Sequence, residues 1–210
     1  MSAGGAHPAL GYRELGAPGA PPRPPLLALA SSDFDLEPQL AGLEHRFRVL
    51  LLAAPRRANP RRFGLPSLTG DWYLGDDEAP DPLGFGLCLE QLERFVVDDA
   101  AGLGPGARPL LVGAGQGAAL ALALACCWPE RLAGVVAIAA ALPPLPEGML
   151  AERPLAGLPI SLAPASSAVE DRARAARAAA ALRARGARVR ELEPGSIEQA
   201  LADLACGARC

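Results

Sequence analysis

A sharp change of pattern at residues 110–119, Leu-Leu-Val-Gly-Ala-Gly-Gln-Gly-Ala-Ala, limits the folds open to this chain more than any other segment. An apolar run typical of a buried strand passes through three glycines into a helix of small residues. Glycine tolerates positive φ and close backbone approach, so this spacing predicts a tight strand-to-helix turn.

The rest of the chain alternates in the same way. Apolar runs predict strands over 11–15, 26–30, 47–53, 109–113, 132–141, 158–162 and 189–192. Helical spacing is found over 36–43, 85–100, 116–127, 171–185 and 196–205. This alternation predicts an α/β protein with a mostly parallel sheet covered by helices on both faces. No repeat or linker divides the 210 residues, so we expect one domain over 1–210, with a Pro/Gly-rich strand and turn at 1–25.

Two fingerprints compete for the glycine pattern of the junction. The dinucleotide pattern GxGxxG would begin at Gly113 and Gly115, with Ala118 in its last position. The acidic residue expected about 20 residues further on is missing, because 133–141 is wholly apolar. No nucleotide cofactor is therefore expected. The nucleophile elbow Gly-x-Ser-x-Gly, which lifts a serine above a sheet, is the better match.

The stretch from Pro109 to Leu142 resembles the small bacterial phospholipase/carboxylesterase family, whose elbow reads Gly-Phe-Ser-Gln-Gly. Residues 71–77, Asp-Trp-Tyr-Leu-Gly-Asp-Asp, are similar to that family's pocket loop, and 179–189 to its late helix, turn and strand. The resemblance implies an α/β-hydrolase fold over nearly the entire chain. It also implies carboxylic-ester or thioester hydrolysis as the parent activity, and a homodimer.

The departures from that family fall on its catalytic triad. Gly115 stands at the serine position, the acid position aligns with Ser167, and the histidine position aligns with Ile197. No histidine follows His45, and the family's oxyanion segment His-Gly-x-Gly is replaced by Leu-Ala-Leu-Ala-Ser-Ser at 27–32. Nucleophilic catalysis needs an activatable heteroatom, which glycine lacks. We therefore predict a catalytically inactive homologue, a pseudoenzyme that retains a ligand-binding or partner-binding cleft.

An alternative is a hydrolase that acts through non-standard groups. Asp33 and Asp35 lie near the lost oxyanion segment and are candidates for acid–base work with water, although loop or helix-cap carboxylates are the favoured interpretation. His45 immediately precedes a predicted strand, which places it away from the carboxyl ends of the strands, where ligands gather. Cys126 and Cys127 lie about three turns into their helix and are interpreted as packing groups.

Charged segments are interpreted as solvated surface. The acidic run Asp76, Asp77, Glu78 and Asp81 shares a long connection with Arg56, Arg57, Arg61 and Arg62, so pairing within that connection or plain solvation is expected. Arginines along 172–185 decorate an alanine-rich helix and are interpreted as its solvated face.

The candidate cleft consists of Leu29, Ala30, Trp72, Tyr73, Gly115, Gln116 and Gly117. Backbone N–H groups of Gln116 and Gly117 open a helix, whose N-terminus favours an anion or a carbonyl oxygen. Trp72 and Tyr73 offer aromatic surface to a small apolar or acyl ligand. In the alternative interpretation, Trp72 pins the long loop onto the core.

Composition excludes several classes of protein. The chain is 20% charged with a formal net charge of −3, whereas a nucleic-acid-binding surface normally shows a basic excess. Five cysteines without paired CxxC spacing, together with two histidines, give no expected metal site. The first 25 residues lack a signal-peptide pattern, and the apolar run 118–127 is too short for a membrane span. We therefore expect a cytoplasmic protein without a membrane or nucleic-acid partner.

Overall fold

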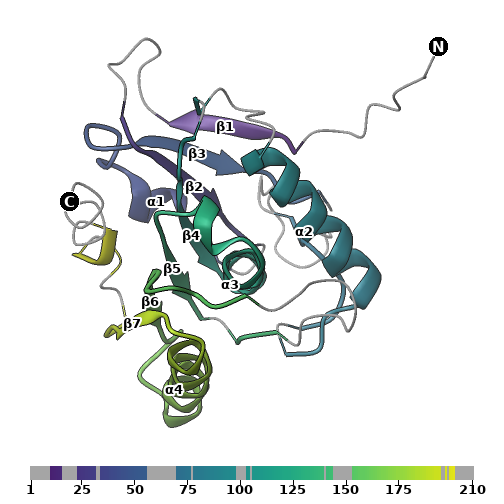
Figure 1. The fold of residues 1–210 in the computed structure, drawn as a ribbon, viewed down its shortest axis with the longest axis vertical. Coiled ribbons are helices and arrows are strands. Elements are labelled where there is room, and N and C mark those ends of the chain that lie inside the picture. The colour runs from purple at the N-terminus through teal and green to yellow at the C-terminus, as the bar shows by residue number, and fades with distance from the viewer. Residues whose placement is uncertain are drawn as a thin grey trace.

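The computed structural model describes residues 10–15, 23–31, 34–55, 70–76, 78–97, 103–104, 106–139, 141–143, 153–194, 197 and 199–201. Its centre is a seven-stranded sheet in the order β1-β3-β2-β4-β5-β6-β7 (Figure 1). The strands are β1 Tyr12–Leu15, β2 Pro25–Leu29, β3 Arg48–Leu52, β4 Leu110–Ala114, β5 Gly134–Ile138, β6 Pro159–Ala163 and β7 Arg188–Glu191. Only β1 is antiparallel to its neighbour in this sheet; all other pairs are parallel. The predicted α/β class is confirmed.

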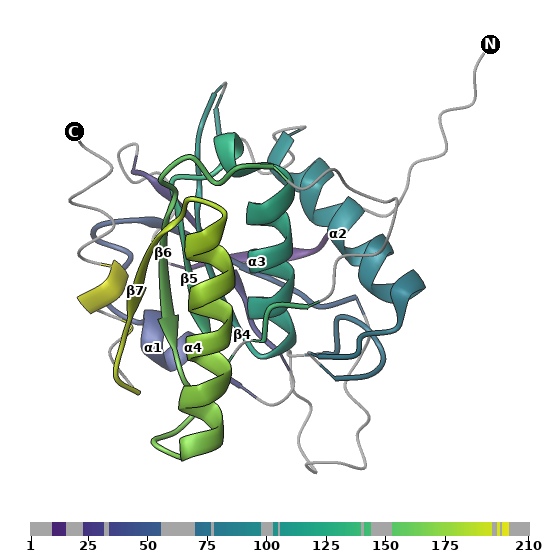
Figure 2. The same cartoon turned by 60° about the horizontal axis from the view of Figure 1, so that its bottom comes forward.

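Helices cover both faces of the sheet. The α-helices are α1 Glu37–Leu40, α2 Pro82–Val97, α3 Gln116–Cys127 and α4 Val169–Ala184, and a short 3₁₀ turn, η1, spans Pro129–Arg131. Figure 2 shows α2, α3 and α4 side by side in front of the sheet and α1 behind it. On the α1 side of the sheet, the buried Leu40 of α1 belongs to one apolar core with Ile197, Ala200 and Leu201 of the last described helical turn. The sheet is thus a middle layer with a core on each side.

Strand alternation sends successive side chains into the two cores. In β2, Leu27 and Leu29 belong to the core under α2, α3 and α4, whereas Leu26 and Ala28 belong to the core under α1. Side chains of successive strand residues point to opposite faces. A strand buried on both faces therefore reads as a continuous apolar run, which explains the patterns at 26–30 and 109–113.

The central helix α3 is buried at every residue except Gln116. It packs against β4, β5 and α2. Its alanines and glycine allow close approach to the sheet, and a helix that is apolar all round is expected in the interior of a domain. The outer helix α4 buries only a narrow face, made of Ala175, Ala178, Ala179 and Leu182.

Two predicted elements are only about half as long as the sequence indicates. The strand predicted over 132–141 spans only Gly134–Ile138, because Ala139 has a φ of +57° and turns the chain out of the sheet. The helix predicted over 36–43 is limited to Glu37–Leu40, since Ala41 is extended and Gly42 has a φ of +86°. Of the helix predicted over 196–205, residues 197 and 199–201 are helical, and 196, 198 and 202–205 lie outside the described residues.

Candidate functional site

The predicted elbow is present at the carboxyl end of β4. Gly115 precedes α3 with a φ of +53° and a ψ of −123°. Its N–H donates a hydrogen bond to the Ile138 carbonyl of β5 over 3.0 Å, and its carbonyl accepts from the N–H groups of Ala118 and Ala119 over 2.9 and 3.0 Å. Such a positive φ favours glycine over residues with a side chain. Gly115 is therefore the apex residue of the turn.

Close packing explains the two outer glycines of the motif. A methyl group at Gly113 would lie 2.4 Å from the carbonyl oxygen of Gly117, and one at Gly117 would lie 2.0 Å from the carbonyl oxygen of Leu29. Both distances fall well inside van der Waals contact. At Gly115, by contrast, a methyl group would meet only Ser31, whose Oγ would be 3.1 Å away. The outer glycines are thus required by contacts with the backbone, whereas a methyl group at the apex would meet a single side chain.

Ser31 is the site residue that sequence reasoning missed. It follows β2 and is 3% exposed, and its Oγ has no hydrogen-bond partner among the described residues. An unpaired buried hydroxyl costs about 1–3 kcal/mol. The pairing of the strands could have indicated its position, because β2 and β4 pair Leu29 with Gly113. Ser31 and Gly115 each lie two residues further along the chain, just beyond the ends of these strands.

The side chain of Gln116 holds the neighbouring loop against the elbow. Its Oε1 accepts hydrogen bonds from the backbone N–H groups of Trp72 and Tyr73 over 2.8 and 3.5 Å. Its Nε2 donates to the carbonyls of Tyr73 and Gly75 over 3.1 and 3.3 Å. The segment from Trp72 to Gly75 is therefore fixed next to the start of α3.

Trp72 and Tyr73 lie in the core, 0% and 1% exposed. The Trp72 indole N–H donates to the Ala30 carbonyl over 2.7 Å, and the Trp72 carbonyl accepts from the Cys88 thiol over 2.8 Å. The Tyr73 ring packs edge-on against Phe85 at 5.2 Å between centroids. These contacts match the interpretation that Trp72 pins the loop, and neither aromatic side chain offers surface to a ligand in this structure.

The positions aligned with the family's acid and histidine have different surroundings. Ser167 is exposed in the connection between β6 and α4. Ile197 is 2% exposed and packs in the core on the α1 face of the sheet. A buried isoleucine cannot accept or donate a proton.

The other acid–base candidates lie away from the apex or already have a structural contact. His45 is exposed just before β3, at the amino ends of the parallel strands, and its Nδ1 contacts the Gly42 carbonyl. The Asp35 carboxylate accepts a hydrogen bond from the Glu37 N–H over 3.0 Å, at the start of α1. Asp33 and Ser32 lie outside the described residues.

The cysteines of α3 are buried thiols. Cys126 and Cys127 are 0% and 2% exposed, which agrees with the packing role expected from the sequence. Burial, reinforced by the neighbouring Cys126, raises the pKa of the Cys127 thiol to about 12. A thiol that keeps its proton at neutral pH is a poor nucleophile.

The acidic loop before α2 is ordered by its own backbone. Asp76 accepts hydrogen bonds from the N–H groups of Glu78 and Ala79 over 3.0 and 2.6 Å. Asp81 caps α2 by accepting from the Gly84 N–H over 2.7 Å. The solvated interpretation of these residues missed both roles, and Asp77 lies outside the described residues.

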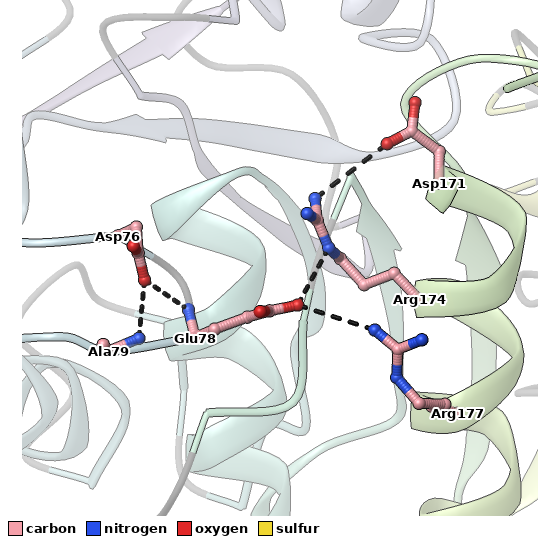
Figure 3. Close-up of polar contacts among 6 residues, drawn as sticks. All are labelled: Asp76, Glu78, Ala79, Asp171, Arg174 and Arg177. Carbon is pink, nitrogen blue, oxygen red and sulfur yellow. Dashed lines mark hydrogen bonds and ion pairs between the residues drawn. The ribbon is translucent and has the colours of Figure 1, made fainter. Parts of the chain in front are cut away.

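Glu78 joins this loop to α4 by ion pairs. Its Oε1 lies 3.1 Å from Nε of Arg174 and 3.7 Å from a terminal nitrogen of Arg177, and Arg174 also lies 3.9 Å from Asp171 (Figure 3). All four side chains are partly or well exposed, so each pair contributes little. The arginines expected to pair with the acidic run, at 56, 57, 61 and 62, lie outside the described residues.

The residues that the structure describes form no metal-binding cluster and no membrane-spanning helix. No group of three or more His, Cys, Asp or Glu side chains within them is placed to hold a metal ion. Within the same ranges, no helix has the length and apolar character needed to cross a membrane.

No family model and no curated protein matches the sequence. Among solved structures, a carboxylesterase from Bacillus cereus is similar with a TM-score of 0.68 and 18% identity, covering 95% of this chain and 94% of that one. A carboxylesterase from Mesorhizobium loti has a TM-score of 0.68 and 22% identity, with coverage of 92% and 94%. A phospholipase/carboxylesterase from Dyadobacter fermentans has a TM-score of 0.65 and 14% identity, with coverage of 98% and 100%. This chain therefore has the α/β-hydrolase fold seen in the bacterial carboxylesterases.

Proposed function

We propose that this protein is a catalytically inactive, carboxylesterase-like α/β-hydrolase homologue that binds a small ligand at its elbow. The observation that carries this proposal is Gly115, which stands at the apex of the turn and has no side chain able to attack a carbonyl carbon. Loss of the nucleophile in such a triad lowers turnover by roughly 10⁶-fold.

A replacement nucleophile would need a base within hydrogen-bond reach. The sequence has no histidine after His45, and His45 lies at the opposite end of the parallel strands. Cys127 is buried with a raised pKa, and Ser31 has no hydrogen-bond partner among the described residues to take its proton. These features support binding without hydrolysis.

The start of α3 supports a ligand that presents an oxygen atom. Neither the Gln116 nor the Gly117 backbone N–H has an acceptor among the described residues. Helix N-termini stabilise anions and carbonyl oxygens through such free N–H groups. Leu29 and Ala30 add apolar surroundings, so a small apolar or acyl ligand is the class that we propose.

The test is hydrolysis of a panel of aryl esters and acyl thioesters by the wild type and by Gly115→Ser. We expect neither protein to exceed the buffer rate, because restoring a hydroxyl does not supply a base. An active bacterial carboxylesterase assayed in parallel is the control for substrate quality.

Three results would contradict the proposal. Turnover by the wild type that disappears in Asp33→Asn or Asp35→Asn would establish the alternative, a hydrolase with non-standard groups. Strong activity of Gly115→Ser would reveal a base near the apex. A covalent acyl adduct on wild-type protein, detected by mass spectrometry, would identify a nucleophile.

A further inference from the structure

We propose that the Ser31 hydroxyl and the first N–H groups of α3 form a binding site for a carboxylate, so that the ligand of this protein is a small carboxylic acid rather than an ester. This inference rests on the proposed ligand-binding function and names the chemical class of the ligand.

The first support is the state of the Ser31 hydroxyl. Its Oγ is buried and has no partner in the described part of the chain, and Ser31 as a whole is 3% exposed. Buried hydroxyls in native proteins nearly always have a hydrogen-bond partner, either within the protein or in a bound molecule. A hydrogen-bond partner beyond the described residues is therefore expected beside Ser31, and a bound molecule is the partner that we propose.

The second support is where this hydroxyl lies. Its oxygen is 3.1 Å from the point that a Cβ atom would occupy at Gly115, the residue before the first turn of α3. Gly115 and Gln116 are both partly exposed, so the apex is open to solvent. The hydroxyl thus occupies the neighbourhood where the resembled family carries its serine, but it comes from the end of β2.

The third support is the kind of group available for binding. The Gln116 and Gly117 N–H groups only donate hydrogen bonds, and no described residue accepts from either of them. A carboxylate offers two acceptor oxygens, one for the helix N-terminus and one for the hydroxyl. The helix dipole places about half a positive charge at this end, which stabilises a bound anion.

The experiment measures binding of acetate, butyrate and octanoate by calorimetry, with phosphate and chloride at equal ionic strength as comparison anions. Wild type is compared with Ser31→Ala and with Ser161→Ala, which removes a buried hydroxyl from the middle of β6. We expect saturable carboxylate binding by the wild type and by Ser161→Ala. Ser31→Ala should bind at least about tenfold more weakly, because a hydrogen bond to a charged group is lost.

Two further measurements test the proposal without relying on the affinity of a variant. Without ligand, Ser31→Ala should unfold at the same or a higher temperature than the wild type, since an unpaired hydroxyl has been removed. In the wild type, carboxylate addition should move the amide proton resonances of Gln116 and Gly117 downfield.

Several outcomes overturn the proposal. Equal carboxylate affinity in Ser31→Ala excludes Ser31 as a ligand contact. Absence of saturable carboxylate binding means that water is the hydrogen-bond partner of the Ser31 hydroxyl. Tighter binding of phosphate than of any carboxylate means that the proposed ligand class is wrong. Ester turnover would contradict the proposed function instead, and it would leave the measured role of Ser31 unchanged.

Discussion

The elbow and the positions at the ends of β6 and β7 are tied to the fold in different ways. At the elbow, Gly113 and Gly117 lie so close to neighbouring backbone that no side chain fits. After β6, Ser167 is exposed, and after β7, Ile197 packs like any core residue. The first region is fixed by backbone contact, whereas neither of the others has such a constraint.

This difference shows that the elbow motif carries two kinds of information, one about the fold and one about catalysis. In this chain, close backbone contacts require glycine at positions 113 and 117, whatever residue stands at the apex. Residue 115 differs, because a side chain there would meet only the side chain of Ser31, and its positive φ is the constraint that the backbone imposes. A glycine-rich elbow alone is therefore evidence of fold and not of hydrolysis.

The largest effect is expected from Gly117→Ala. Its methyl group would lie 2.0 Å from the Leu29 carbonyl oxygen, so β2 and α3 must move apart. We expect the free energy of unfolding, measured by urea denaturation, to fall by more than about 3 kcal/mol. Gly11→Ala is the control, since its methyl group would lie at an ordinary 3.8 Å from Ala53 and should change stability by less than about 1 kcal/mol. Similar stability of Gly117→Ala and Gly11→Ala would show that backbone contact does not require glycine at position 117.

A smaller loss is expected from Ile197→His, which puts back the residue type of the resembled family. Because Ile197 is 2% exposed in an apolar core, an imidazole there loses packing and hydrogen bonds to water. The expected loss is about 2–3 kcal/mol by chemical denaturation. Ile197→Leu keeps the volume and should lose less than about 1.5 kcal/mol. If Ile197→His were as stable as the wild type, position 197 would not be a core position.

The smallest effect is expected from Glu78→Gln, which releases the loop beside the elbow from α4. The Glu78 pairs with Arg174 and Arg177 are exposed. The free energy of unfolding in low salt should therefore fall by less than about 1 kcal/mol, and the difference from the wild type should vanish in 1 M NaCl. Glu90→Gln breaks the exposed Glu90–Arg94 pair within α2 and serves as the matched control. A loss that persists in high salt would show that the loop depends on α4 for more than charge.

The sheet and its helices were predictable because their signals are local. The run at 110–119 carries strand, turn and helix within ten residues, and β2 and β4 are apolar throughout because both faces are covered. Element ends were harder to predict. The strand β5 ends before Ala139 and the helix α1 ends before Ala41, because both alanines adopt backbone angles outside these elements. Alanine in a sequence does not indicate such a change of backbone angle.

The site was predictable only in part, for a similar reason. Gly115, Gln116 and Gly117 are neighbours in the chain, so their proximity follows from the motif. The contact of Trp72 with Ala30 joins residues 42 positions apart, and that of Arg174 with Glu78 spans 96 positions. Neither contact has a periodic signal. Ser31 needed the pairing register of two strands before its position beside Gly115 was visible.

The bond between the Trp72 indole and Ala30 has a practical consequence for spectroscopy. The sequence contains two tryptophans, and Trp72 is the one whose ring is sealed from water within hydrogen-bonding distance of the segment that leads to Ser31. Release of the loop would bring this ring into contact with water and shift its fluorescence emission to longer wavelength. The molecule therefore contains an intrinsic optical probe of whether the region around its elbow is closed.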